Sequence, residues 1–229
     1  MSETNGANGP LTAEVYENGK FKFGAETAAA SPYGRSGAVV GDKFYSCGGS
    51  GGYTMDGSCH IYSITENNWQ PLGSKSPTPT FMAAIASDGV KYVYIVQDRT
   101  LQRLDTQSST WDILAQPPRK IYAGDRAVFV DGSEPSLVVC GNQPVVPYCV
   151  RYSIAADEWS SFASPAPMPY NQNAYKLLVC SGRLYNFMHT QAFYSDSAVQ
   201  VYDEQSQSWS VVEGASLEEE RYGFEVVCI

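Results

Sequence analysis

HIYSITENNW, residues 60–69, has the pattern of a β-hairpin: a short alternating strand, a polar turn and a second strand that carries a tryptophan. The same pattern returns in LQRLDTQSSTW (101–111), VRYSIAADEW (150–159) and VQVYDEQSQSW (199–209). Each tryptophan follows an apolar or aromatic residue by seven positions, and the four tryptophans, the only ones in the chain, are 42, 48 and 50 residues apart. A constant offset at this period predicts a repeated supersecondary unit.

Two further apolar runs precede each hairpin. The nearer runs are KFYSCGG (43–49), KYVYIVQ (91–97), SLVVCGN (136–142) and RLYNFMH (183–189), and the farther runs are SGAVV (36–40), FMAAIA (81–86), DRAVFV (125–130) and AYKLLVC (174–180). Every unit therefore has four predicted strands, which is typical of β-propeller blades. An immunoglobulin-like sandwich does not explain why tryptophan returns once in every four strands, and no segment shows the 3.6-residue period of a helical solenoid.

The first unit resembles the kelch repeat family, because it combines Gly48-Gly49 after its second strand with Tyr62 in its third and Trp69 in its fourth. The later units keep the tryptophan hairpin, and only Gly141-Asn142 in the third matches the glycine pair in part. The resemblance implies an all-β propeller of four-stranded antiparallel blades. Its predicted blades are residues 35–72, 80–114, 125–162 and 174–212, within a single domain of residues 14–229.

Both ends of the chain carry additional strand patterns. Tyr16 precedes Phe23 by seven residues, which matches the offset of the tryptophan hairpins, and RYGFEVVCI (221–229) matches the first strand of the other units. We therefore expect a composite fifth blade from residues 14–24 and 221–229, with residues 1–13 as a flexible tail. This blade lacks one strand, and an unpaired strand edge allows oligomers to form. Five blades are also fewer than kelch propellers usually have, so a fragment of a longer propeller is an alternative.

The charge of the chain restricts its partners. The formal net charge is −9 and the sequence pI is about 4.7, so that nucleic acid and anionic membrane surfaces are repelled. A neutral or basic protein or peptide fits better. No run approaches the roughly 20 apolar residues that span a bilayer, and residues 1–10 are polar, without the apolar core of a signal peptide. These features predict a cytoplasmic protein.

That compartment bears on the state of the cysteines. Four of the six, Cys47, Cys140, Cys180 and Cys228, lie inside apolar runs, where a thiol usually behaves as a small buried hydrophobic group. Because disulfides are rare in the cytosol, the sequence predicts reduced thiols in the core. The chain has no CxxC pair and only two histidines, so we expect no metal site and no cofactor.

Functional residues of such a fold are expected on its loops. Tyrosine recurs where the chain enters the first strand of a blade, with an arginine or an asparagine close by, and tyrosine and arginine are favoured in binding hot spots. The candidate partner-binding residues are Tyr33, Arg35, Tyr122, Arg126, Tyr170, Asn171, Arg221 and Tyr222. The competing interpretation is that these side chains pack between neighbouring blades.

Three functions are compatible with this pattern. The resemblance to kelch propellers favours a non-catalytic protein-interaction platform that binds a peptide or protein on its loops. A carbohydrate-binding module is the alternative, because aromatic and amide side chains lie in the same loops. A sugar mutarotase of the sialic-acid type is the weaker one, since a histidine and an arginine on one face suffice for proton transfer. His60 and His189 lie in separate blades, so that a copper centre is not expected.

Overall fold

The computed structural model describes residues 9–10, 14–17, 20–26, 30–31, 33–51, 54–141, 147–165, 173–190 and 197–215. All regular structure in this part of the chain is β-strand. The chain packs as two compact units, residues 1–114 and 115–229. Within the described ranges, no helix is long and apolar enough to cross a membrane.

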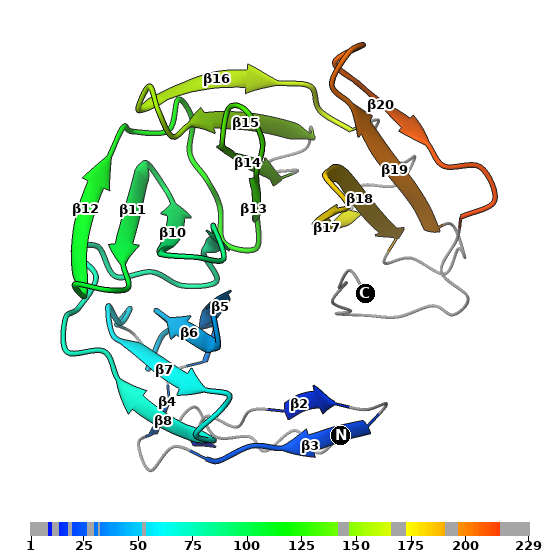
Figure 1. Ribbon diagram of the computed structural model, residues 1–229. Helices are drawn as coiled ribbons and strands as arrows, with labels where there is room; N and C mark the ends of the chain where they lie inside the picture. Colours follow the sequence, from blue (N-terminus) through cyan, green and yellow to red (C-terminus); the bar gives the residue numbers. More distant parts are fainter. Residues whose placement is uncertain are drawn as a thin grey trace. The chain divides into compact units, whose positions relative to one another are not determined.

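Four sheets each contain four antiparallel strands that pair in chain order (Figure 1). In the first unit, the first sheet consists of β5 (Ser36–Val40), β6 (Lys43–Cys47), β7 (Cys59–Ser63) and β8 (Asn68–Pro71), and the second of β9 (Ala84–Ser87), β10 (Tyr92–Gln97), β11 (Thr100–Asp105) and β12 (Thr110–Leu114). In the second unit, the third sheet consists of β13 (Arg126–Val130), β14 (Ser136–Gly141), β15 (Tyr148–Ser153) and β16 (Glu158–Phe162), and the fourth of β17 (Asn173–Cys180), β18 (Arg183–Thr190), β19 (Ser197–Asp203) and β20 (Ser208–Val211).

The predicted all-β class and the four groups of four strands are confirmed. One strand begins later than the sequence predicts, because β9 starts at Ala84 and not at Phe81. Met82 has a φ of 47°, a left-handed conformation that interrupts extended backbone, so that residues 81–83 belong to the connector before the strand.

The N-terminal segment forms a hairpin of β2 (Glu14–Glu17) and β3 (Lys20–Phe23). The predicted equivalence of Phe23 with the tryptophans is wrong, because Tyr16 pairs with Phe21. The strands are separated by only Asn18-Gly19, a dipeptide typical of two-residue hairpin connections, whereas the tryptophan hairpins have four-residue turns. The shorter connection moves the partner of the tyrosine two positions toward the N-terminus.

Two further strands lie near this hairpin in the sequence. Gly9–Pro10 (β1), inside the segment expected to be a flexible tail, pairs with Ala30–Ser31 (β4). Residues 221–229, the other half of the expected composite blade, lie outside the described residues.

The four tryptophan hairpins share one turn conformation. The residue two positions before each tryptophan has a positive φ: Asn67 at 50°, Ser109 at 58°, Asp157 at 53° and Gln207 at 50°. Asparagine and aspartate tolerate this left-handed conformation better than serine and glutamine do. The repeat is therefore conserved in backbone geometry even where its side chains differ between sheets.

The tryptophan of each hairpin also ties the sheet to a segment one repeat earlier. Trp69 Nε1 donates to the carbonyl of Ala25, Trp159 Nε1 to that of Ala115 and Trp209 Nε1 to that of Ala163, each at 2.8 Å. The return of tryptophan in these three sheets thus has a structural reason beyond apolar packing, because each of the three indole N–H groups reaches a backbone carbonyl of the preceding repeat.

In the third sheet, Asp157 completes this tie. Its Oδ1 atom accepts hydrogen bonds from the Tyr152 hydroxyl (2.6 Å) and from the Ala115 amide (2.9 Å), while Trp159 holds the Ala115 carbonyl. Tyr152 and Trp159, seven positions apart, thus act together on Ala115. Tyr152 positions the carboxylate that accepts from its amide, and Trp159 donates to its carbonyl. We call this arrangement the turn clamp.

Asn67, Tyr62 and Ala25 form the same turn clamp in the first sheet, with distances of 2.6 and 2.8 Å. The second sheet has Leu104 and Ser109 at the corresponding positions, and there the indole nitrogen of Trp111 has no hydrogen-bond partner. The clamp therefore depends on the tyrosine and the Asn or Asp, and not on the tryptophan alone.

Each unit has its own apolar core. In the first unit, the core includes Val40 and Tyr45 from the first sheet and Leu72, which directly follows that sheet, with Val93, Ile95 and Leu104 from the second. In the second unit, it includes Val138 and Phe162 from the third sheet with Leu177, Leu184 and Tyr202 from the fourth. The first strands of neighbouring sheets lie against each other, β5 against β9 and β13 against β17, so that both units pair their sheets in the same manner.

The prediction of reduced thiols is wrong for the described cysteines. Cys47 is bonded to Cys59 across β6 and β7, and Cys140 to Cys149 across β14 and β15, with Cα atoms 4.1 and 4.2 Å apart. Cys180 is also disulfide-bonded. The residues of each printed pair oppose one another directly in the strand register, which brings the two sulfur atoms together.

Candidate functional site

One end of the first sheet carries an exposed apolar surface. The backbones of Tyr33, Ser50 and Met55 continue the strand pairing there as successive antiparallel bridges, so that these residues lie in one row. Ser50, in the middle, is small and buried, whereas the side chains of Tyr33 and Met55 are 57% and 52% exposed. Two large apolar side chains therefore flank a small polar residue on this row.

The connector between β8 and β9 adds to this row. The ring of Phe81 lies edge-on to that of Tyr33 at a centroid distance of 5.2 Å, and the amide of Met82 donates to the carbonyl of Gly34 at 2.7 Å. The side chain of Met82 is 43% exposed. Tyr33, Met55, Phe81 and Met82 therefore form one surface, here called the Tyr33 surface.

Two buried glutamines hold that connector in place. Gln97 donates to the carbonyl of Phe81 (2.6 Å) and accepts from its amide (2.8 Å), and Gln102 does the same with Thr78, at 2.8 Å for both bonds. Each glutamine side chain thus makes with one connector residue the pair of hydrogen bonds that the backbone of a neighbouring strand would make. Since their residues are only 8% and 1% exposed, these bonds are shielded from water and fix the position of Phe81.

Arg35, a predicted binding residue, lies below this surface with a side chain only 5% exposed. Its guanidinium donates to the carbonyls of Ser46 (2.7 Å) and Ser58 (2.9 Å), and it contacts Nδ1 of His60 at 3.1 Å and Asp56 at 3.8 Å. The side chain therefore joins β5 to the facing ends of β6 and β7, and its donors are used within the protein.

The charges around Arg35 are arranged to keep His60 neutral. Burial and then the charge of Arg35 lower the pKa of His60, which Asp56 opposes only in part. Burial acts to raise the pKa of Asp56, but hydrogen bonds from Ser58 and the charges of Arg35 and Lys75 bring it below its ordinary value. A neutral His60 accepts the hydrogen bond from the guanidinium, so that the cluster carries one cation and one anion.

The corresponding end of the third sheet has a different arrangement, centred on Asp125. This residue is 4% exposed, and its Oδ2 atom accepts hydrogen bonds from the Tyr148 hydroxyl and from the Tyr122 amide (2.7 Å). Burial raises the pKa of Asp125, although these hydrogen bonds and the charges of Arg119 and Arg126 act against the shift. Burial and the neighbouring Asp125 also raise the pKa of Tyr148.

Cations surround this carboxyl group. The guanidinium of Arg119 lies over the ring of Tyr148 at 3.5 Å, and the ammonium of Lys120 lies 5.2 Å from the ring centre of Tyr122. Arg126, the first residue of β13, contributes a further positive charge near Asp125. This group, here called the Asp125 cluster, is locally basic in a chain of net charge −9.

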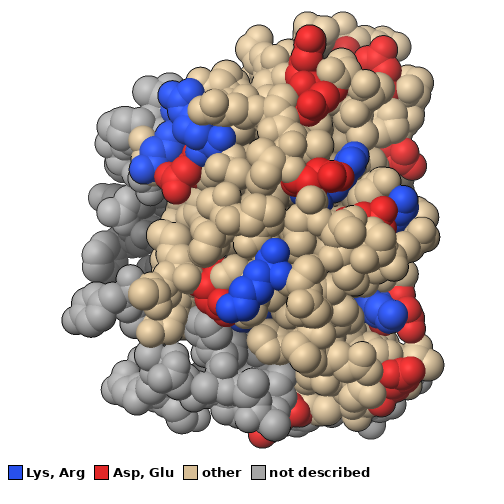
Figure 2. All heavy atoms as spheres, turned by 90° about the vertical axis from the view of Figure 1, so that its left-hand side faces the viewer, with Lys and Arg blue, Asp and Glu red and all other residues tan. Residues whose placement is uncertain are grey.

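Surface charges elsewhere are interspersed. Figure 2 shows one face on which Lys and Arg side chains lie beside Asp and Glu side chains and most of the surface is uncharged. Ion pairs of this kind join Arg103 to Asp112 at 2.7 Å and Lys91 to Asp105 at 2.9 Å. Exposed pairs such as these contribute about 1 kcal/mol or less to stability.

The predicted binding residues differ in where the structure places them. Tyr33 is exposed and Tyr122 half-buried at the ends of their sheets, as a binding role requires, whereas Arg35 is buried and bonded internally. Arg126 is half-buried beside Asp125. The remaining four, Tyr170, Asn171, Arg221 and Tyr222, lie outside the described residues.

Sequence reasoning missed Met55, Met82 and Asp125. Met55 lies in a loop without strand alternation, whereas Met82 was included in the predicted strand of residues 81–86. Only the pairing of three loop segments brings them beside Tyr33. Asp125 was included in a predicted strand, and the signal for its role is its position between Tyr122 and Arg126 in a segment rich in Arg, Lys and Tyr.

Known proteins offer no assignment of this surface: no protein-family model matches the chain, and no curated protein matches it in sequence. Among the described residues, no group of three or more His, Cys, Asp or Glu side chains is placed to hold a metal ion.

Proposed function

We propose that the chain is a non-catalytic protein-interaction platform, built from kelch-like propeller blades, that binds a peptide segment of a partner at the loop ends of its sheets. Three features support the propeller architecture. The four strands of each sheet follow one another in chain order, the first strands of the two sheets in each unit lie together, and tryptophans bond three of the four sheets to the preceding repeat.

The observation that carries the proposal is the Tyr33 surface. Tyrosine, phenylalanine and methionine are enriched in protein interfaces. Here Tyr33, Met55 and Met82 are exposed, beside the half-buried Phe81, on backbone segments that hydrogen bonds already fix. Because Arg35, Gln97 and Gln102 hold those segments from below, little conformational entropy is lost when a partner binds. A preorganised apolar surface of this kind is typical of a binding site.

The partner that fits best is a neutral or basic peptide with at least one large apolar side chain. Its apolar side chain would bury Tyr33, Phe81 and Met82, and the net charge of −9 favours approach of basic flanking residues. The sugar mutarotase is less well supported, because Arg35 and His60 bond to each other and the arginine donors are used within the protein.

The disulfides bear on the compartment in which this binding takes place. Disulfide bonds persist in oxidising compartments and are rare in the cytosol. The bonds Cys47–Cys59 and Cys140–Cys149 therefore favour an oxidising compartment over the cytoplasmic location that the sequence predicts.

A displayed library of random peptides would test the proposal. Peptides selected on the intact chain should contain a large apolar residue and carry no net negative charge. Replacing Tyr33 with Ser and Met82 with Asn should weaken their binding by at least tenfold, because both side chains are exposed and contact the bound peptide. Asparagine tolerates the φ of 47° at position 82, so the double variant should fold.

The matched control replaces Val39 and Val90, which are 47% and 78% exposed near the opposite end of the first two sheets, with serine. It removes as many exposed apolar side chains but should leave peptide affinity unchanged. Selection of no peptide, or equal loss of affinity in both variants, would refute the Tyr33 surface as the binding site. A second pair of variants, Tyr122→Ala and Lys120→Gln, asks whether the Asp125 cluster takes part.

A further inference from the structure

A separate cavity of about 410 Å³ lies between the third and fourth sheets. Its volume is within the range of small-molecule sites. Val130 at the end of β13 and Leu184 near the start of β18 are among its lining residues. The cavity is therefore at the end of these sheets opposite the Asp125 cluster.

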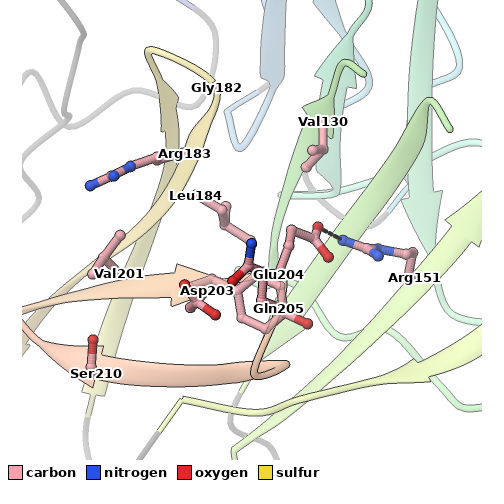
Figure 3. Close-up of a pocket in the computed structure, with 11 residues that line it drawn as sticks. Val130, Arg151, Gly182, Arg183, Leu184, Val201, Asp203, Glu204, Gln205 and Ser210 are labelled. Atoms are coloured by element: carbon pink, nitrogen blue, oxygen red, sulfur yellow. Dashed lines mark hydrogen bonds and ion pairs between the residues drawn. The ribbon is translucent and has the colours of Figure 1, made fainter. Parts of the chain in front are cut away.

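The carboxylates of the cavity already have partners. Glu204 pairs with Arg151 at 2.5 Å, and Asp203 accepts hydrogen bonds from the amide and the hydroxyl of Ser206 at 2.7 and 2.9 Å. In Figure 3, Arg183 lies on the other side of the cavity from the Arg151–Glu204 pair and points away from it. Arg183 is exposed and makes no ion pair with any described residue. Because exposed side chains change rotamer within nanoseconds, its guanidinium can turn from the outward direction seen in Figure 3 to meet a ligand in the cavity.

Tyr202 supplies an uncommitted hydroxyl group. Its counterparts Tyr62 and Tyr152 donate to Asn67 and Asp157 in the turn clamp. In the fourth sheet Gln207 occupies that turn position, and the Tyr202 hydroxyl makes no hydrogen bond to a described residue. Of the three tyrosines at this position, Tyr202 is the one whose hydroxyl has no partner among the described residues. It is also the one that lines the cavity.

The remaining lining groups define the ligand further. The side chains of Gln205 and Ser210 are exposed in the cavity and offer both donors and acceptors, as a hydroxyl-bearing molecule needs. Val130, Leu184 and Val201 supply apolar contacts for its carbon atoms. Two arginines and two carboxylates give the lining no net charge. A ligand with one negative charge beside Arg183 therefore fits better than a ligand with two.

We propose that this cavity binds a small polyhydroxylated monocarboxylate, with its carboxylate on Arg183 and a hydroxyl group on Tyr202. Arginine binds carboxylates through paired N–H donors, which gives the carboxylate a defined position. The hydroxyl groups along the carbon chain of the ligand then form hydrogen bonds with Tyr202, Ser210 and Gln205.

The test uses D-gluconate as the probe, with D-glucose and glucose 6-phosphate for comparison, in calorimetric titrations of the intact chain. Gluconate should bind saturably, and the neutral sugar and the phosphate dianion at least fivefold more weakly. Arg183→Gln should reduce gluconate affinity about tenfold or more, since a hydrogen bond to a charged group is lost. Tyr202→Phe should reduce it about threefold to tenfold, without loss of thermal stability because the hydroxyl has no partner to lose.

Controls separate ligand binding from folding. Tyr62→Phe breaks a turn clamp and should lower the melting temperature while gluconate affinity stays unchanged. Lys43→Gln removes an exposed charge in the other unit and should also leave affinity unchanged. Gln207→Asn should supply Tyr202 with the acceptor that Asn67 gives Tyr62, and so stabilise the protein while weakening gluconate binding.

The proposal is overturned if gluconate does not bind, if glucose or glucose 6-phosphate binds as tightly, or if affinity is unchanged in either Arg183→Gln or Tyr202→Phe. Loss of peptide binding in the Tyr33 and Met82 variants has no bearing on these outcomes, because the two sites are at different ends of their sheets and are measured with different ligands.

Discussion

Asp125 shows how a single buried side chain determines both the stability and the charge of a loop end. Its carboxyl group holds the backbone of Tyr122 and the hydroxyl of Tyr148, so that the loop and the start of β15 are joined through one oxygen atom. Ionisation is nevertheless unfavourable there, because burial raises the pKa of Asp125 above its ordinary value of 3.8. The arginines nearby reduce this cost without removing it.

This raised pKa predicts a specific dependence of stability on pH. In the folded state Asp125 binds a proton more tightly than in the unfolded state, so its contribution to stability is complete below pH 3.8 and is lost as the pH rises through the folded pKa. Asp125→Asn keeps an oxygen for Tyr122 and Tyr148 but does not titrate. The difference in unfolding free energy, wild type minus variant, should therefore decrease as pH rises above about 3.8.

Urea unfolding of both proteins between pH 3 and pH 7 would measure this difference directly. Other carboxylates with lowered pKa values, such as Asp105 and Asp203, have the opposite pH dependence, but they are present in both proteins and cancel. A difference that rises with pH would show that Asp125 is stabilised as the anion.

At the scale of the hairpin, the features that the sequence could predict are those that depend on local pattern. The period of the tryptophans and the alternation of the strands placed β5, β6 and their counterparts within a few residues, because both depend on local pattern. The N-terminal hairpin was misaligned, since a two-residue connection shifts the register in a way that a fixed seven-residue offset cannot represent. Contacts of Tyr33 with Phe81 and of Arg35 with β7 depend on long-range packing, which no local pattern reports.

The turn clamp also makes a prediction about hairpin stability. Asp157→Ala removes the acceptor for the Tyr152 hydroxyl and the Ala115 amide and leaves both groups unpaired. The loss should be about 2 to 3 kcal/mol of unfolding free energy. Ser109→Ala is the matched control, because it also places alanine at a left-handed turn position, in the sheet where Leu104 replaces the tyrosine of the clamp.

Urea denaturation followed by tryptophan fluorescence would compare the two variants. The control should change the unfolding free energy by less than about 0.5 kcal/mol, since no clamp is broken. Equal effects of both substitutions would mean that alanine at the left-handed position causes the loss, and the clamp would contribute nothing measurable.

At the scale of the whole chain, the disulfides follow from the register that the repeat imposes. Once Phe44 opposes Tyr62, antiparallel pairing places Cys47 opposite Cys59, and the same step from Leu137 and Tyr152 places Cys140 opposite Cys149. The pairing was therefore implicit in the predicted register, whereas the cytoplasmic location that the sequence predicts argues against disulfides. In the second sheet the corresponding positions hold Val96 and Leu101, both fully buried.

This correspondence predicts how the bonds can be replaced. Removing either disulfide with paired serines should cost about 2 to 3 kcal/mol, because a loop of 12 or 9 residues is released in the unfolded state and polar groups enter the core. Cys47→Val with Cys59→Leu should cost less, since it reproduces the apolar pair that the second sheet already packs.

Melting temperatures with and without a reducing agent measure both effects. Reduction should destabilise the wild type more than a variant in which both bonds are replaced by valine and leucine. If the denatured, unreduced protein instead releases all six thiols to a thiol reagent, the bonds are absent and the argument for an oxidising compartment fails with them.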